Sequence, residues 1–183
     1  MLRECAHVAS RERRSSYNET MSLRDTEERA EAGSVAAQCI MGCTLVWGGE
    51  IDGETLEPDY PRALHYLLQA ADAGAARALY HLGVLYEDGL GVPEDLARAV
   101  ALHERAASAG EYYAVLHLAR LCADGRLGSS DVARATSWYQ RLLELAQNMG
   151  TLDIDDEMEL DEARMFIATG TLPESAARSR GCP

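Results

Sequence analysis

The chain has 183 residues, is 47 % hydrophobic and carries a formal net charge of −13. This length favours one domain with a buried core, and the negative charge argues against nucleic acid as a partner, because phosphate binding needs a basic surface. All 17 basic residues are arginine, which excludes chemistry that requires a lysine. Either codon bias or avoidance of lysine-directed modification explains the absence of lysine. Abundant leucine and alanine with a single phenylalanine favour helices.

Residues 1–24 carry several arginines among polar residues and lack the apolar core of a secretory signal. We predict a flexible N-terminal leader and a cytoplasmic protein, with export still open if the true start lies upstream. Apolar runs in the chain stay well below the ~20 residues of a membrane span, so a membrane is not an expected partner.

Residues 25–149 are predicted to form pairs of helices, and the central pair is the clearest. Apolar residues recur every three or four positions from Ala78 to Tyr86, which predicts a helix over 75–88. The sequence from Asp88 to Pro93 contains two glycines and a proline and predicts a turn. A second helix follows over 94–109 and ends at Gly110.

The same plan recurs at a spacing of 36 residues. Asp124-Gly125 and Asp131 correspond to Asp88-Gly89 and Asp95 of the central pair, which predicts helices over 111–124 and 130–147. An earlier pair is predicted over 30–47 and 59–73, and its first helix is expected to begin as early as Thr26. Five residues are inserted in its turn, within the acidic segment 49–58, where we expect a solvated loop. A fixed period of this size is typical of a solenoid.

Residues 151–170 are predicted to form a helix that caps the last pair. Seven of the ten residues in DIDDEMELDE are acidic, which favours a helix start, and Leu160, Ala163, Phe166 and Ile167 then form an apolar stripe. A calcium loop is excluded because Met158 occupies the position that requires glycine. A second role of this segment as an acidic arm for a basic partner stays open. Residues 171–183 are predicted to be a mobile tail.

The repeated pattern resembles the Sel1-like repeat, a relative of the tetratricopeptide repeat. The resemblance covers about residues 31–146. It rests on these residues of the central copy: Ala78, Leu82, Gly83, Tyr86, Gly89, Gly91, Val92, Pro93, Asp95, Arg98, Ala99, Ala106, Ala107 and Gly110. It implies an all-α fold, a right-handed α-solenoid of three such helix-turn-helix repeats over about 30–74, 75–110 and 111–147, with the C-terminal capping helix. It also implies a protein-binding adaptor or scaffold whose partner is another protein.

The resemblance further implies that the first helix of each repeat lines a concave groove. Counting around these helices gives the candidate partner-binding residues: Cys39, Cys43, Arg77, Tyr80, His81, Val84, Glu87, Tyr113, Leu116, His117 and Arg120. We expect the tyrosines to supply contact area and the arginines Arg77 and Arg120 to bind carboxylates of a peptide or helix. His81 and His117 occupy equivalent positions and are expected to line the groove.

Other interpretations of these residues stay open. Tyr80 and Tyr113 could pack between neighbouring helices, and the chain could be a structural subunit that self-associates without binding a peptide. Cys39 and Cys43 lie one helical turn apart and could form a redox or metal pair, although zinc sites usually have four ligands. We predict no catalytic residues, metal or cofactor, because the sequence lacks a nucleophile elbow, a phosphate loop and a zinc-protease motif.

Overall fold

The computed structural model describes residues 22–51, 54–149 and 154–172. The predicted leader lies almost entirely outside the described residues, as does most of the predicted tail. The chain divides into two compact units, the first ending at Ala99 and the second beginning at Val100.

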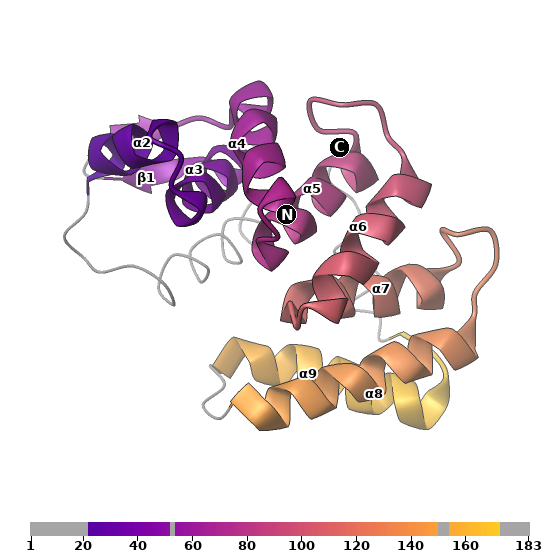
Figure 1. Cartoon of the computed structure of the whole chain (residues 1–183). Coiled ribbons are helices and arrows are strands. Elements are labelled where there is room, and N and C mark those ends of the chain that lie inside the picture. Colours follow the sequence, from indigo (N-terminus) through magenta and orange to yellow (C-terminus); the bar gives the residue numbers. More distant parts are fainter. Residues whose placement is uncertain (1–21, 52–53, 150–153, 173–183) are drawn as a thin grey trace. The chain divides into compact units, whose positions relative to one another are not determined.

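The first unit is built from helices and one small hairpin (Figure 1). Its elements are α2 (Leu23–Glu31), α3 (Val35–Trp47), β1 (Gly49–Ile51), β2 (Glu54–Leu56), α4 (Tyr60–Asp72), α5 (Ala76–Asp88) and the start of α6 (Leu96–Ser108). Helix α3 packs against α2, α4 and α5. The approach of α3 to α4 is close, because a Cβ added at Gly42 would lie 2.5 Å from Cγ of Leu67, which is fully buried.

The second unit continues α6 and contains α7 (Tyr112–Asp124), α8 (Val132–Met149) and α9 (Ile154–Thr169). Helix α8 packs against both α7 and α9, and α8 and α9 run side by side (Figure 1). Leu160, Ala163 and Phe166 are buried, and the ring of Phe166 lies 4.9 Å from that of Tyr139 on α8. The apolar stripe predicted for the capping helix therefore faces the preceding repeat.

An aspartate begins the second helix of every repeat and bonds in the same two ways each time. Its backbone N–H donates to a carbonyl near the end of the first helix at 2.8 Å, and its carboxylate accepts a bond from the N–H three residues later. The aspartates and their carbonyl partners are Asp59 with Leu45, Asp95 with Tyr86, and Asp131 with Cys122. One side chain thus caps the second helix and ties it to the first.

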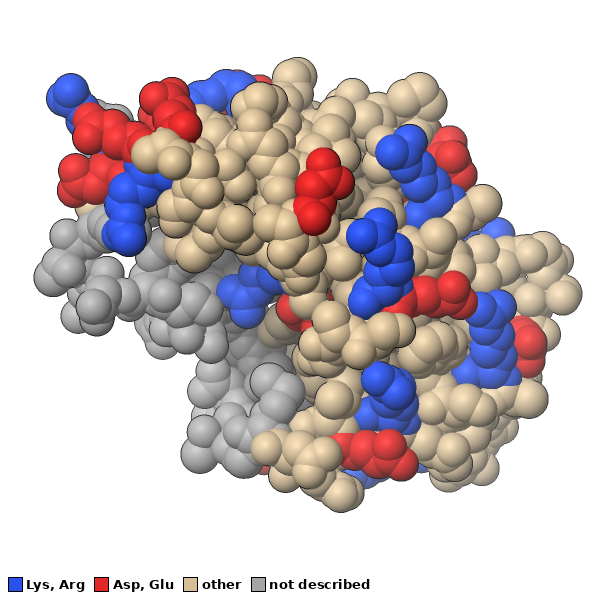
Figure 2. Space-filling model, in the orientation of Figure 1, with Lys and Arg blue, Asp and Glu red and all other residues tan. Residues whose placement is uncertain are grey.

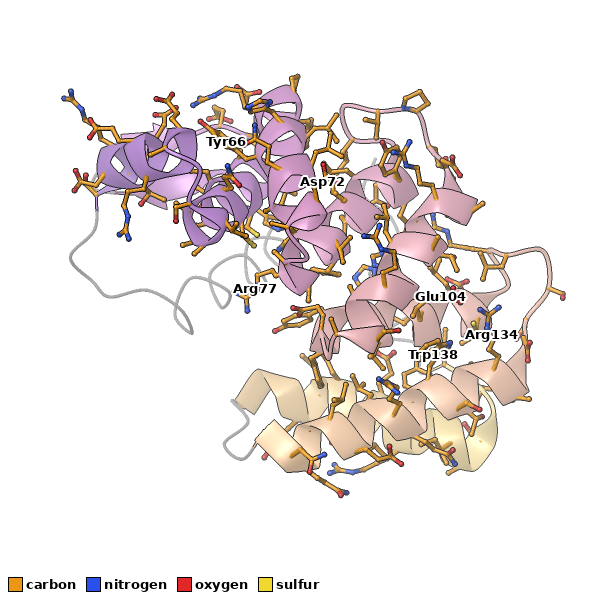
Figure 3. All side chains as sticks on the ribbon, viewed as in Figure 1. Tyr66, Asp72, Arg77, Glu104, Arg134 and Trp138 are labelled. Carbon is orange, nitrogen blue, oxygen red and sulfur yellow. The ribbon has the colours of Figure 1, made fainter. Side chains whose placement is uncertain are left out.

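The arginine of the same motif has a different partner in each repeat. Arg62 pairs with Glu27 of α2, and Arg98 stacks over the ring of Tyr86 at 4.2 Å. Arg134 of α8 pairs with Glu104 of α6 at 2.7 Å, and both are labelled in Figure 3. The motif therefore fixes the position of this arginine but not its contact.

The prediction of one helix from Thr26 to Trp47 is wrong, because Gly33 interrupts it with a φ of 88° and separates α2 from α3. Gly74 and Gly110, which follow α4 and α6, both have a φ of 87°. All three glycines stand in the sequence Ala-x-Ala-Gly and share one hydrogen-bond pattern, in which the residue after the glycine donates to the carbonyl five positions earlier. Helix α2 therefore ends like the second helix of a repeat.

The acidic insertion, expected to be a loop, contains a short antiparallel hairpin. Gly49 pairs with Leu56 and Ile51 with Glu54. Gly48 precedes the hairpin with a φ of 64°, and a Cβ there would lie 2.5 Å from the carbonyl oxygen of Leu56. Glycine is therefore required at the entry to this turn.

The capping contact predicts the effect of Asp95→Ala. The substitution removes the bond to the N–H of Arg98, so we expect the free energy of unfolding to fall by about 1 kcal/mol in urea denaturation followed by circular dichroism. Asp72→Ala, at an exposed position in the last turn of α4, should change it by less than about 0.5 kcal/mol. Equal losses in the two variants would contradict the capping role.

The close approach of α3 and α4 predicts that Gly42→Ala costs about 1–3 kcal/mol, because the new methyl group would overlap the buried Leu67 side chain. The same substitution introduced into a Leu67→Ala background should cost clearly less, because the smaller side chain leaves room for it. A double-mutant cycle by urea denaturation measures this coupling. Additive effects would show that the contact is not close.

Candidate functional site

The candidate positions in the first unit divide into a partly exposed set and a buried set. Cys39 and Cys43 of α3 and Arg77 in the first turn of α5 are partly exposed. Figure 3 labels Arg77. The buried positions, all on α5, are Tyr80 with 2 % exposure, His81 with 0 %, Val84 with 2 % and Glu87 with 7 %.

Aromatic rings surround the buried His81. The ring of Tyr80 lies 4.8 Å from the His81 ring, and that of Trp47 at the end of α3 lies 6.4 Å away in an edge-on arrangement. The burial of Tyr80 and His81 favours the interpretation in which such side chains pack between helices. Their assignment as partner contacts stays a prediction, but only the partly exposed positions offer a surface that a partner can touch directly.

In the second unit, α7 carries the equivalent positions. Tyr113, His117 and Arg120 are partly exposed, whereas Leu116 is 1 % exposed. The ring of Tyr113 meets that of Tyr112 edge-on at 5.4 Å. The ring of His117 lies 5.3 Å from that of His103 on α6.

Arg120 has a partner inside the protein. Its guanidinium donates two hydrogen bonds to the carboxylate of Glu162 on α9, at 2.9 and 2.7 Å. The hydroxyl of Tyr139 on α8 donates to the same carboxylate at 2.6 Å. Three helices of this unit thus meet at one buried acid, which is 7 % exposed. Arg120 was predicted to bind a partner's carboxylate, and in this structure its guanidinium binds Glu162 of the capping helix.

The protonation of this cluster follows from its surroundings. Burial alone would lower the pKa of Arg120, but the hydrogen bonds and charge of Glu162 outweigh it and raise that pKa above its ordinary value. Burial raises the pKa of Tyr139, and the adjacent Glu162 carboxylate raises it further. Arg120 therefore stays charged and Tyr139 stays a hydrogen-bond donor at neutral pH.

Sequence reasoning missed Glu162 and Tyr139 as partners of Arg120. A signal was present, because Arg120 interrupts the apolar run from Leu118 to Cys122, and Glu162 lies four positions before Phe166 on the inner face of the capping helix. A charge on an inward face implies an opposite charge across the interface. Which acid and which arginine meet depends on how the helices stack.

Of the cysteines that the structure describes, Cys39 and Cys43 are partly exposed and Cys122 is buried. Burial raises the pKa of the Cys122 thiol, so this side chain is poorly suited to act as a thiolate. Cys39 and Cys43 remain the candidates for the redox interpretation, which stays a prediction.

Charged side chains of both signs are intermingled over the face drawn in Figure 2. Ion pairs in the protein include Arg134 with Glu104 and Arg164 with Asp161, each at 2.7 Å. Among the residues that the structure describes, no helix is long and apolar enough to cross a membrane.

Comparisons with known proteins agree with this architecture. The family model "Sel1 repeat" matches residues 35–74, 76–111 and 113–146. The crystal structure of a Sel1 repeat protein from Oxalobacter formigenes is similar, with 29 % identity and a TM-score of 0.54, and the alignment covers 76 % of this chain and 96 % of that chain. These matches confirm the resemblance seen in the sequence and the predicted all-α solenoid of three repeats.

A protective antigen present in uropathogenic Escherichia coli strains, which displays an SLR fold, is similar with a TM-score of 0.62 and 24 % identity. The alignment covers 88 % of this chain but only 34 % of that chain, so it concerns the fold alone. No curated protein matches this chain.

The cluster around Glu162 predicts the effect of Glu162→Ala. The substitution leaves the Arg120 charge and the Tyr139 hydroxyl without their shared acceptor, so we expect the free energy of unfolding to fall by about 2–3 kcal/mol. The lower end of the range for buried pairs applies because the Arg120 side chain is 31 % exposed. Asp161→Ala, whose side chain is 74 % exposed, is the matched control and should cost less than about 0.5 kcal/mol in urea denaturation. A loss at Glu162 no larger than at Asp161 would contradict this account.

Proposed function

This chain belongs to the Sel1 repeat family, whose members generally mediate protein–protein interaction. We propose that it binds a peptide or helix of another protein on the first helices of its repeats. The family is a non-catalytic scaffold type, and the proposal assigns this chain no reaction. The cytoplasmic location expected from the sequence is part of the same proposal.

The observation that carries the proposal is the composition of the partly exposed positions on α3 and α5, two helices that pack against each other. Cys39, Ile40 and Cys43 offer an apolar area on α3. Arg77 on α5 corresponds to Ala36 of α3 and offers a cation one repeat further along. A segment with an apolar anchor and an acidic side chain would suit this surface, because arginine forms charge-assisted hydrogen bonds with carboxylates.

The second unit offers a smaller surface of the same kind. Tyr113 and His117 on α7 are partly exposed, and an aromatic ring supplies contact area with little loss of side-chain entropy. Arg120 is left out of the proposed contacts, because Glu162 holds its guanidinium.

Arg77→Glu tests the proposal. Peptides selected from a displayed random library with the wild-type protein should combine an apolar residue with aspartate or glutamate. The substitution should weaken their binding by roughly tenfold or more, measured by fluorescence anisotropy, because it replaces a charge-assisted hydrogen bond with repulsion. The loss should shrink at high salt.

Arg105→Glu is the matched control, because it makes the same charge change at an exposed position on α6, which is the second helix of its repeat and lies outside the proposed surface. It should leave the affinity within about twofold. Equal losses in the two variants would indicate a general effect of net charge, and unchanged binding by Arg77→Glu would place the binding surface elsewhere. A wild-type protein that selects no peptide and forms a stable oligomer by light scattering would favour the structural-subunit interpretation.

A further inference from the structure

Helix α9 carries apolar residues on two faces. On its inner face Leu160 and Phe166 are 4 % and 1 % exposed. On the opposite side, Met158 and Met165 are 68 % and 43 % exposed. A helix that merely closes a repeat array has a polar outer face. Packing onto α8 therefore explains the inner face and leaves the exposed methionines unexplained.

The exposed residues of α9 correspond to positions at which the first helix of a repeat contacts the helix that follows the repeat. Helix α9 is followed by Gly170 with a φ of 70°, as α7 is followed by Gly125 with a φ of 76°. Counting back from these glycines, Met165 of α9 corresponds to Arg120 of α7, the residue through which α7 binds α9. Asp161 corresponds in the same way to Leu116, which is 1 % exposed in α7.

Met158, Asp161 and Met165 lie at spacings of three and four residues and therefore share one face, which we call the α9 outer face. Its chemistry narrows the choice of partner. Methionine side chains are flexible and pack against apolar groups of different shapes. Glu157 and Asp161 are exposed beside or between them, and over the whole sequence of α9 there are six acidic residues against one arginine.

We propose that the α9 outer face docks an amphipathic helix of another protein that carries arginine or lysine beside its apolar stripe. The apolar stripe packs on Met158 and Met165, and the basic residues meet Glu157 and Asp161. The α9 outer face and the surface on α3 and α5 consist of different residues, so each can be tested by its own substitutions.

A second copy of this chain fits the α9 outer face less well. Two α9 outer faces packed together would bring Glu157 and Asp161 of both copies into one interface, and like charges oppose such a contact. Helix α2 of a second copy fits the α9 outer face no better, because none of the strongly exposed large apolar side chains among the described residues lies on α2. The methionines would then meet a charged surface.

The probe for the experiment is a synthetic amphipathic helical peptide with leucine on one face and lysine and arginine on the other, labelled with fluorescein. Anisotropy titration should show saturable binding to wild-type protein. Met158→Ser/Met165→Ser should weaken it by about tenfold or more, because both apolar contacts are lost. Glu157→Gln/Asp161→Asn should weaken it by a few-fold and flatten its salt dependence.

Two controls separate this contact from general attraction to an acidic protein. A scrambled peptide of the same charge should bind at least about tenfold more weakly, because it cannot present an apolar stripe. Leu68→Ser, at another exposed apolar position, should leave the affinity unchanged. Circular dichroism on every variant confirms that the helices persist.

The proposal is overturned if wild-type protein does not bind the peptide, if scrambled and amphipathic peptides bind equally, or if the methionine variant binds as well as wild type. It is also overturned if light scattering shows a wild-type oligomer that the methionine variant loses, because a second copy then covers the α9 outer face. The first three outcomes leave the proposed function on α3 and α5 intact.

Discussion

The fold depends on one aspartate at the start of the second helix of each repeat. Its backbone N–H binds the first helix while its carboxylate caps the second, so one residue sets the turn between them. Four positions later stands an alanine that is completely buried in every repeat, at Ala63, Ala99 and Ala135. The alanine side chain faces the interior, on the same helix whose start the aspartate caps. A motif of five residues thus combines helix capping with close packing.

The arginine within this motif has the same backbone role in every repeat but a different side-chain contact in each. Its backbone N–H takes part in the cap each time, yet its side chain pairs with Glu27, stacks on Tyr86 or pairs with Glu104. The backbone geometry is set by a local motif and recurs, whereas the side chain reaches whatever the neighbouring helix presents. Surface chemistry, and with it partner choice, can therefore vary between repeats without altering their frame.

Glu162 gives the end of the array a defined structure. It accepts bonds from Arg120 of α7 and Tyr139 of α8, so α9 is fixed to both helices of the last repeat by a buried acid as well as by Leu160 and Phe166. Paired buried charges specify an arrangement more than they strengthen it. With its inner face fixed in this way, α9 presents Met158 and Met165 outward in a constant orientation, which is what a docking surface requires.

The sequence by itself determined the pairing of helices, the turns of the second and third repeats, the family and the apolar stripe of the capping helix, because these depend on short spacings and on a repeated motif. It could also have revealed that α2 ends like a second helix, since Ala30 to Gly33 repeats the Ala-x-Ala-Gly found at the ends of α4 and α6. Only the tertiary structure decided which candidate residues remain accessible. Tyr80 and His81 were predicted to line the groove because of their positions on the first helix of the central repeat. In the structure, neighbouring side chains cover both of them. The tertiary structure also decided that Arg120 pairs with Glu162, which lies 42 residues away in the sequence. This pairing depends on how α9 packs on α7, and no short sequence spacing encodes that packing.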